Sequence, residues 1–192
     1  MWVEVIGLPG VGKTTLIQKC RKEISAQYQV IESKHQNIVE RIVTKMLSIF
    51  VYRSLLGKTK FAKKLSYRHG FRALRPSRKN IFFFDSGVCQ LLIEHLIEED
   101  FHNAEISLNA IEKAGFPDHI VYLKDDLQSV IEREMHRNPR RFDLSADEIQ
   151  ERYQKAQKWI ENELLQKIAF VDTITPENNL DLIKVLDCEK TL

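Results

Sequence analysis

The sequence predicts an α/β fold with a parallel sheet, formed by a single domain over residues 1–192. Short apolar runs at residues 2–6, 80–84, 119–123 and 168–172 alternate with longer segments in which apolar residues recur at helical spacing. A glycine-rich loop follows the first of these runs directly. Strands that alternate with helices form parallel sheets covered by helices on both faces. These observations therefore favour a three-layer α/β sandwich.

The first half of the chain begins with an apolar strand and continues mainly as helix. Residues 2–6 (WVEVI) are typical of a strand buried on both faces. Apolar spacing predicts a helix over residues 15–27, and a second strand follows at residues 28–32. A long apolar stripe over residues 36–56 leads into a basic helical segment that ends near Pro76.

The second half contains the clearest strands and helices. The segment "NIFFFDSG" at residues 80–87 is an apolar strand that ends in Asp, Ser and Gly. Helices are expected over residues 88–99 and 104–114, and Pro117 separates them from the strand "HIVYL" at residues 119–123.

Polar residues mark the starts of the next two helices. Asp125 or Asp126 can cap a helix over residues 127–136. Ser145 and Glu148 form the S-x-x-E pattern of a capping box before a further long helix.

Composition restricts the class of protein. The chain is 43% hydrophobic, which suffices for one full core. Its longest apolar runs, such as residues 81–84, are too short to span a bilayer, and no basic region precedes an apolar one at the N-terminus. The cysteines, Cys20, Cys89 and Cys188, are widely spaced without a CxxC pair. We therefore expect a reduced, cytoplasmic protein without a zinc site.

The most specific motif is the glycine-rich loop. Residues 7–14 (GLPGVGKT) match G-x-x-x-x-G-K-[ST], the P-loop or Walker A pattern, between a strand and a helix. Backbone N–H groups of such a loop and of the following helix surround phosphate oxygens. Lys13 can reach the β- and γ-phosphates of ATP, and the Thr14 hydroxyl can ligate Mg²⁺. The expected ATP-binding residues are Gly7, Pro9, Gly10, Val11, Gly12, Lys13, Thr14 and Thr15.

A second candidate is Asp85, at the carboxyl end of the strand "IFFF". Ligands of open α/β sheets bind at the carboxyl ends of the strands, so Asp85 is expected on the same edge as the loop. Its carboxylate can hold Mg²⁺ together with Thr14, or accept a proton from an attacking hydroxyl. The alternative is an aspartate that only caps the following helix.

A third candidate is the arginine cluster in "RNPRRFD". Arg133 and Arg137 lie one helical turn apart, and Arg140 and Arg141 follow Pro139 in a loop. Guanidinium groups suit the charge on a transferring phosphoryl group, so Arg137, Arg140 and Arg141 are candidate catalytic residues of a lid over residues 136–146. The alternative is a solvated basic turn paired with nearby acidic residues.

Together these segments resemble the thymidylate kinase and deoxynucleoside kinase group of P-loop kinases, over nearly the whole chain. "GLPGVGKTTL" resembles the phosphate loop of that group, and "IFFFDSG" its strand ending in an acid that serves the acceptor. "PDHIVYLKDDLQSVIERE" is similar to the strand and helix that lead into the lid, with "RNPRRF" in the lid position, and "IAFVDTITPENNLDLI" to the closing strand and helix. The resemblance implies a five-stranded parallel sheet in the order 2-3-1-4-5.

The acceptor-side motifs differ from those of the group. Ser86 and Gly87 follow Asp85 where an arginine is usual, and residues 32–37 (ESKHQN) replace the Arg-Glu-Pro-Gly segment. The donor half therefore resembles the group more than the thymidine-binding half. The acceptor is left open between a nucleoside or nucleotide and a sugar or acidic glycan terminus.

A basic stretch lies where the group binds its acceptor. Residues 41–84 contain no Asp or Glu, and the basic acceptor-side region is expected over residues 36–79. It can attract an anionic acceptor or, through residues 41–79, a membrane surface, or it can be a solvated helical face. No recognised nucleic-acid-binding module is present, so nucleic acid is not expected as a partner. The candidate acceptor contacts are Lys34, Arg53, Arg68 and Arg72.

The sequence thus predicts an ATP-dependent phosphotransferase that uses Mg²⁺. Lys13 and the loop grip the donor, Asp85 serves the metal or the acceptor, and the arginines close over the γ-phosphate. The alternative is a nucleotide-dependent binding protein or ATPase switch, although the N-K-x-D motif of G proteins is missing. The oligomeric state is left open, with a homodimer as one option.

Overall fold

The computed structural model describes residues 2–19, 29–31, 82–84, 87–137 and 144–175. Several expectations fall outside these ranges, among them the basic region over residues 36–79 and most of the lid. The candidate site residues outside the described part are Lys34, Arg53, Arg68, Arg72, Asp85, Arg140 and Arg141.

The centre of the fold is a five-stranded sheet in which neighbouring strands pair in parallel. The spatial order is β2-β3-β1-β4-β5. The α/β class and the parallel sheet that the sequence predicts are confirmed. The strands are β1 (Trp2–Ile6), β2 (Gln29–Ile31), β3 (Phe82–Phe84), β4 (His119–Leu123) and β5 (Phe170–Ile174).

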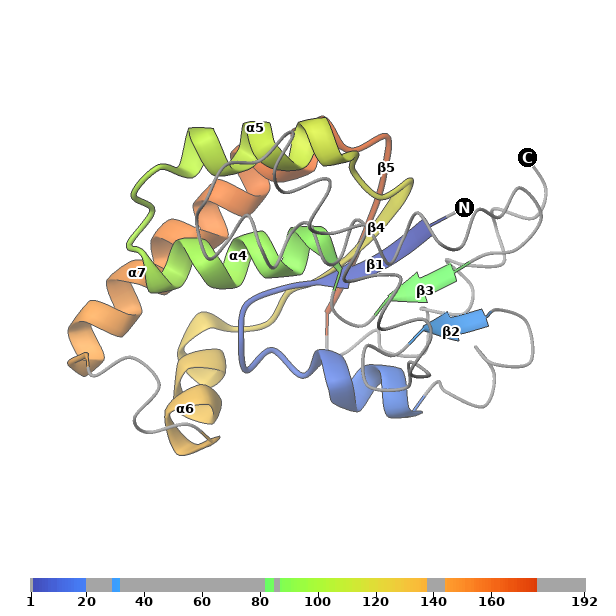
Figure 1. Cartoon of the computed structure of the whole chain (residues 1–192). Coiled ribbons are helices and arrows are strands. Elements are labelled where there is room, and N and C mark those ends of the chain that lie inside the picture. The colour runs from blue at the N-terminus through green and yellow to red at the C-terminus, as the bar shows by residue number, and fades with distance from the viewer. Residues whose placement is uncertain (1, 20–28, 32–81, 85–86, 138–143, 176–192) are drawn as a thin grey trace, which may run out of the picture.

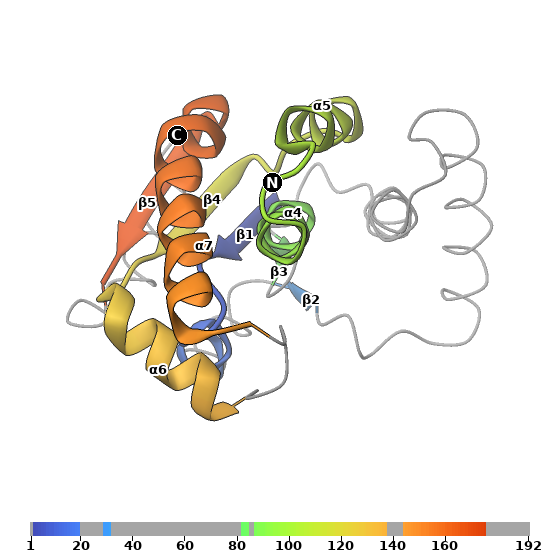
Figure 2. The ribbon, with the colours of Figure 1, turned by 90° about the vertical axis from the view of Figure 1, so that its left-hand side faces the viewer.

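Helices cover both faces of this sheet (Figure 1). The helices α4, α5 and α7 gather on one face, whereas the helix of residues 13–19 lies on the other. Figure 2 shows α7 lengthwise in front of β4 and β5, with α4 beside it. The bounds are α4 (Val88–Glu98), α5 (Ala104–Ala114), α6 (Leu127–Arg137), α7 (Ala146–Trp159), the π-helix η2 (Ile160–Leu164) and the 3₁₀-helix η3 (Leu165–Lys167).

The core lies between the central strands and the helices on them. Val3, Val5 and Ile6 of β1 are fully buried, and all of β4 is buried. Parallel strands with helices on both faces have no solvated side, which explains their nearly continuous apolar runs. Leu92 and Leu96 of α4 meet this surface and are fully buried.

Side chains cap two helices as the sequence predicts. The Ser145 hydroxyl accepts a hydrogen bond from the Glu148 N–H at 3.3 Å, and the Glu148 carboxylate accepts one from the Ser145 N–H at 2.8 Å. These bonds, the side-chain bond from Ser145 first, hold the pKa of Glu148 below its ordinary value. At α6 the capping residue is Asp126, which accepts a bond from the Ser129 N–H at 2.9 Å.

The end of the chain differs from the expected strand over residues 168–172. The strand β5 begins at Phe170, because the chain first turns through η3 and the Ile168 N–H donates to the Leu165 carbonyl at 3.3 Å. None of the helices in the described part combines the length and the apolar character needed to cross a bilayer.

Candidate functional site

The glycine loop, residues 7–14, leaves the carboxyl end of β1 and runs into the helix of residues 13–19. Gly10 has φ +86° and Gly12 has φ +97°, which are backbone conformations that favour glycine. The first helical N–H groups and the loop therefore lie at the sheet edge where ligands of α/β folds bind.

The inner side of the glycine loop packs against β4 and α6. A Cβ on Gly7 would lie 2.5 Å from the Leu123 carbonyl oxygen, which is closer than real Cβ atoms approach. A Cβ on Gly10 would lie 2.6 Å from the Val130 carbonyl oxygen and 3.1 Å from the Glu134 Cβ. The absence of a side chain lets the loop contact the backbone of β4 at Gly7 and, at Gly10, the backbone of α6, the helix that leads toward the predicted lid.

The outer side of the loop is open at Gly12. Among the described residues, apart from Gly12 and its two neighbours in the chain, no atom lies within 4 Å of the place that a Cβ would take there. Pro9 and Val11 are buried, and the Val11 N–H closes a turn onto the Leu8 carbonyl at 3.2 Å. The loop is thus fixed from within and presents open space at its outer surface.

Lys13 lies folded over the loop. Its ammonium group donates hydrogen bonds to the Gly7 carbonyl at 2.9 Å and the Leu8 carbonyl at 3.0 Å. Thr14 and Thr15 follow in the first helical turn and are both exposed. The structure therefore brings together the residues that the sequence assigns to nucleotide binding, with a cation and two hydroxyl groups at the mouth of the loop.

A buried hydrogen-bond network supports the loop from behind. The Gly7 N–H donates to the Gln90 side-chain oxygen at 3.1 Å. Glu4 of β1, only 2% exposed, accepts bonds from the Gln90 N–H at 2.7 Å and the Cys89 N–H at 3.3 Å. A Cβ on Gly87 would lie 2.3 Å from this carboxylate.

Sequence reasoning missed this network. One signal was present, because Glu4 is a charged residue within the apolar run WVEVI. A carboxylate inside a buried strand requires hydrogen-bond donors, so its partners could have been sought at a neighbouring helix N-terminus.

Asp85 itself lies outside the described residues. In β3 the last residue, Phe84, pairs in parallel register with Glu4 of β1. The carboxyl end of β3 therefore lies at the same edge of the sheet as the glycine loop, and α4 begins soon afterwards at Val88.

The two α6 arginines differ in their surroundings. Arg133 forms an ion pair with Asp125 and donates a bond to the Ser129 carbonyl at 3.1 Å. Arg137, the last residue of α6, is exposed. Of the three predicted lid arginines, Arg137 alone lies in the described part of the chain.

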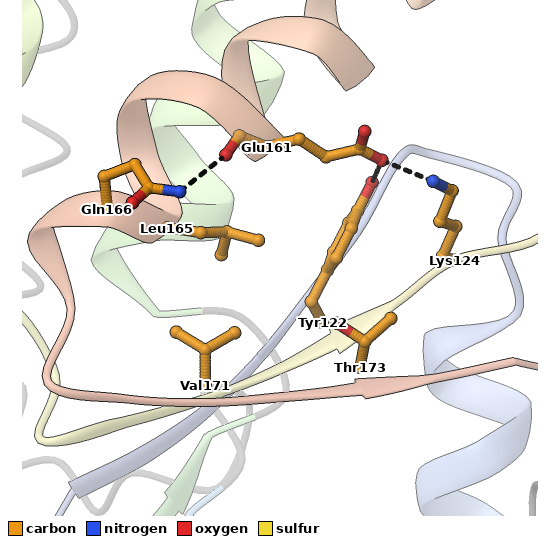
Figure 3. Close-up of a pocket in the computed structure, with 7 residues that line it drawn as sticks. All are labelled: Tyr122, Lys124, Glu161, Leu165, Gln166, Val171 and Thr173. Atoms are coloured by element: carbon orange, nitrogen blue, oxygen red, sulfur yellow. Dashed lines mark hydrogen bonds and ion pairs between the residues drawn. The ribbon is translucent and has the colours of Figure 1, made fainter.

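A pocket of about 310 Å³, lined by no residue of the glycine loop, lies between the face of β4 and β5 and the segment η2–η3 (Figure 3). Figure 3 shows Tyr122 rising from β4 toward the Glu161 carboxylate, with Lys124 reaching it from the other side. The residues that line the pocket are Tyr122, Lys124, Glu161, Leu165, Gln166, Val171 and Thr173.

Glu161 is the centre of a polar cluster in this pocket. It forms an ion pair with Lys124 at 2.8 Å and accepts bonds from the Gln157 amide at 3.2 Å and the Tyr122 hydroxyl at 3.3 Å. Burial acts to raise the pKa of Glu161, but these bonds and the Lys124 charge outweigh it and lower the pKa. Burial, followed by the charge of Glu161, raises the pKa of Tyr122 well above its usual range. The cluster is electrostatically satisfied by its own members.

Thr14, the residue that the sequence assigns to Mg²⁺, has an exposed hydroxyl at the loop. Within the described ranges, no three His, Cys, Asp or Glu side chains gather in a group that could hold a metal ion. The donor set at the loop fits Mg²⁺, which takes oxygen ligands and keeps much of its coordination for water and phosphates.

Comparison with known proteins gives a result at the level of the fold. No family model matches the sequence, and no curated protein matches it. Similar solved structures include deoxyadenosine kinase from M. mycoides with dCMP and a flexible dCDP bound, at 15% identity and a TM-score of 0.58, covering 100% of this chain and 98% of that one. The same enzyme with dATP gives 17% identity and a TM-score of 0.58, covering 100% of this chain and 99% of that one. The chain is therefore similar in fold to these deoxyadenosine kinase structures.

Proposed function

We propose that this protein is a P-loop kinase that transfers the γ-phosphoryl group of MgATP to the hydroxyl group of a nucleoside. The observation that carries the proposal is the glycine loop. It joins two glycines with positive φ, an open outer surface at Gly12 and a lysine at the start of a helix. The likeness to deoxyadenosine kinases over the full chain supports the same class of reaction.

In this proposal the loop amides and Lys13 bind the donor phosphates. The Lys13 ammonium bonds to the Gly7 and Leu8 carbonyls, which hold it over the mouth of the loop. In this proposal phosphate oxygens of the bound nucleotide replace these carbonyls as hydrogen-bond acceptors. Thr14 would hold Mg²⁺, which when bound neutralises charge on the β- and γ-phosphates.

The remaining catalytic roles follow the sequence predictions. Asp85 would accept the proton of the attacking hydroxyl or assist the metal. Arg137, Arg140 and Arg141 would stabilise the charge on the transferring phosphoryl group and exclude water. The contact between Gly10 and the backbone of α6 supports this arrangement, because it places the helix that ends at Arg137 directly against the donor loop.

A nucleoside is the acceptor that the fold favours. The similar structures contain dCMP, dCDP, dCTP or dATP bound to deoxyadenosine kinase. Ser86 and Gly87 stand here where the resembled group has an arginine, so acceptor contacts are assigned instead to basic residues between β2 and β3. These residues are Lys34, Arg53, Arg68 and Arg72.

The test is ADP formation from MgATP with and without acceptors: deoxynucleosides, nucleoside monophosphates, simple sugars and acidic glycans. A deoxynucleoside is expected to raise the rate above the acceptor-free rate. Lys13→Ala is expected to lower kcat/KM by about a hundredfold or more, because it removes a preorganised cation at the transferring group. Lys19→Ala, at an exposed position of the same helix, is the matched control and should leave the rate unchanged.

Three other outcomes would overturn parts of the proposal. Stimulation by a sugar or glycan alone would keep the kinase and replace the acceptor. ADP formation at the same rate without any acceptor would indicate an ATPase or switch. Equal activity of Lys13→Ala and the wild type would contradict the role of the glycine loop.

A further inference from the structure

A continuous set of buried hydrogen bonds joins the glycine loop to the start of α4. The Gly7 N–H donates to Oε1 of Gln90 at 3.1 Å, and the Gln90 N–H donates to Oε1 of Glu4 at 2.7 Å. Gln90 is 1% exposed and Glu4 is 2% exposed. Two backbone groups that lie 83 positions apart in the sequence are thus linked through one buried amide.

The geometry of Gln90 is fixed at both ends of its side-chain amide. Its Nε2 donates to Oε1 of Glu94, one turn further along α4, at 3.1 Å. This bond directs the amide oxygen toward Gly7, so donor and acceptor roles are not interchangeable. Glu4 holds the backbone of the same residue, and the close approach at Gly87 leaves no room for the helix to shift toward β1.

We infer that Gln90 is a positioning residue that makes the glycine loop and the N-terminal turn of α4 move as one body. Its catalytic consequence rests on the proposed function, which gives Asp85 a role in the transfer. Asp85 lies two residues before Gly87 in the sequence. The donor phosphates would be held by the loop that Gln90 fixes at Gly7. Asp85, to which the proposed function assigns the acceptor proton or the metal, precedes that helix in the sequence, so this one amide links the donor loop to the helix that follows Asp85. An error of about 1 Å in the position of reacting groups is enough to lower a rate about a hundredfold.

The first test is hydrogen exchange of the full chain, which does not depend on catalysis. In Gln90→Met the side chain keeps its length and loses the acceptor for the Gly7 N–H. The Gly7 amide is then expected to exchange about tenfold faster or more, since a buried hydrogen bond is lost. On adding MgATP, the wild type should gain protection in residues 7–12 and in residues 87–92, whereas Gln90→Met should gain it in residues 7–12 alone.

Each result of this test bears on one proposal. Unchanged exchange at Gly7, or protection of residues 87–92 in Gln90→Met equal to that in the wild type, would overturn the coupling. A wild type that gains no protection from MgATP would contradict nucleotide binding. In that case the exchange rate of Gly7 without nucleotide still decides the role of Gln90.

The second test exchanges the partners of the hydrogen bond. The double variant Gln90→Glu with Glu94→Gln keeps a carboxylate oxygen for the Gly7 N–H and reverses the donor in the bond between residues 90 and 94. Gln90→Met is expected to lower kcat about tenfold with little change in the KM for ATP, and the double variant is expected to restore most of kcat. A rise in KM without a fall in kcat, or a double variant no better than Gln90→Met, would contradict a positioning role.

Discussion

Two carboxylates, Glu4 and Glu161, show how differently one fold can satisfy a charge. Glu4 is 2% exposed and accepts hydrogen bonds from the backbone N–H groups of Cys89 and Gln90. The Glu161 side chain is 34% exposed. It accepts hydrogen bonds from other side chains and forms an ion pair with Lys124. The first carboxylate is held by the start of a helix, and the second by side chains at a pocket.

The difference lies in what each arrangement fixes. Backbone donors at a helix N-terminus are already ordered by the helix, so Glu4 joins β1 to α4 at little further loss of entropy. Side-chain donors such as Lys124 and Gln157 lose rotamer freedom when they bond, and water screens the partly exposed pair. Glu4 is therefore expected to matter for structure far more than Glu161.

The largest expected effect is that of Glu4→Ala. It leaves the N–H groups of Cys89 and Gln90 without their acceptor in a buried site, and we expect the free energy of unfolding to fall by about 3 kcal/mol. Urea unfolding monitored by circular dichroism measures this value. Glu163→Ala, at an exposed position of η2, is the control and should change it by less than about 0.5 kcal/mol. Equal losses in the two variants would abolish the contrast between the carboxylates.

A smaller effect is expected for Gly87→Ala. The new methyl group would lie 2.3 Å from the Glu4 carboxylate, which must move and weaken its two bonds. We expect a loss of about 2 kcal/mol, as for other overpacked sites. Adding Glu4→Ala removes the clash, so the double variant should lose less than the sum of the single variants. Strictly additive losses would show that Gly87 and Glu4 do not act on each other.

The smallest effect is expected for Glu161→Gln, and it depends on pH. Hydrogen bonds hold the folded-state pKa of Glu161 below the ordinary value of 4.5. Its contribution is therefore fully present above about pH 4.5 and is lost as the pH falls through the folded-state pKa. At pH 7 the variant should lose at most about 0.5 kcal/mol relative to the wild type, and the difference should shrink toward pH 3. If the difference in the free energy of unfolding between wild type and variant grew as the pH fell, the folded-state pKa of Glu161 would not be lowered.

Much of the fold follows from local patterns. The bounds of α5 and β4 coincide with the predicted segments 104–114 and 119–123, because the helical stripe ends at Gly115 and Pro117 separates it from the short apolar run. The capping box of Ser145 and Glu148 also has the predicted bonds. The start of β5 was placed two residues too early, since apolar Ile168 belongs to the turn after η3.

The sequence motif predicts one part of the candidate site, the glycine loop, but not the hydrogen bonds that support it. The glycine loop could be predicted from residues 7–14, because its spacing follows from local backbone requirements. The partnership of Glu4 and Gln90 could not, because 86 positions separate them and only the pairing of β1 with β3 brings α4 to β1. The roles of Asp85, Arg140 and Arg141 stay predictions, since these residues lie outside the described ranges.

The glycine loop contains glycines required by packing and a glycine that packing does not require, and we expect their conservation in evolution to differ. Gly7 and Gly10 are held by contacts with β4 and α6, so a descendant that lost its ligand and kept its fold would still require both. Among the described residues nothing lies near a Cβ at Gly12, and only its backbone conformation and a ligand oppose a side chain there. In a lineage that lost nucleotide binding, we therefore expect Gly12 to be substituted before Gly7 and Gly10.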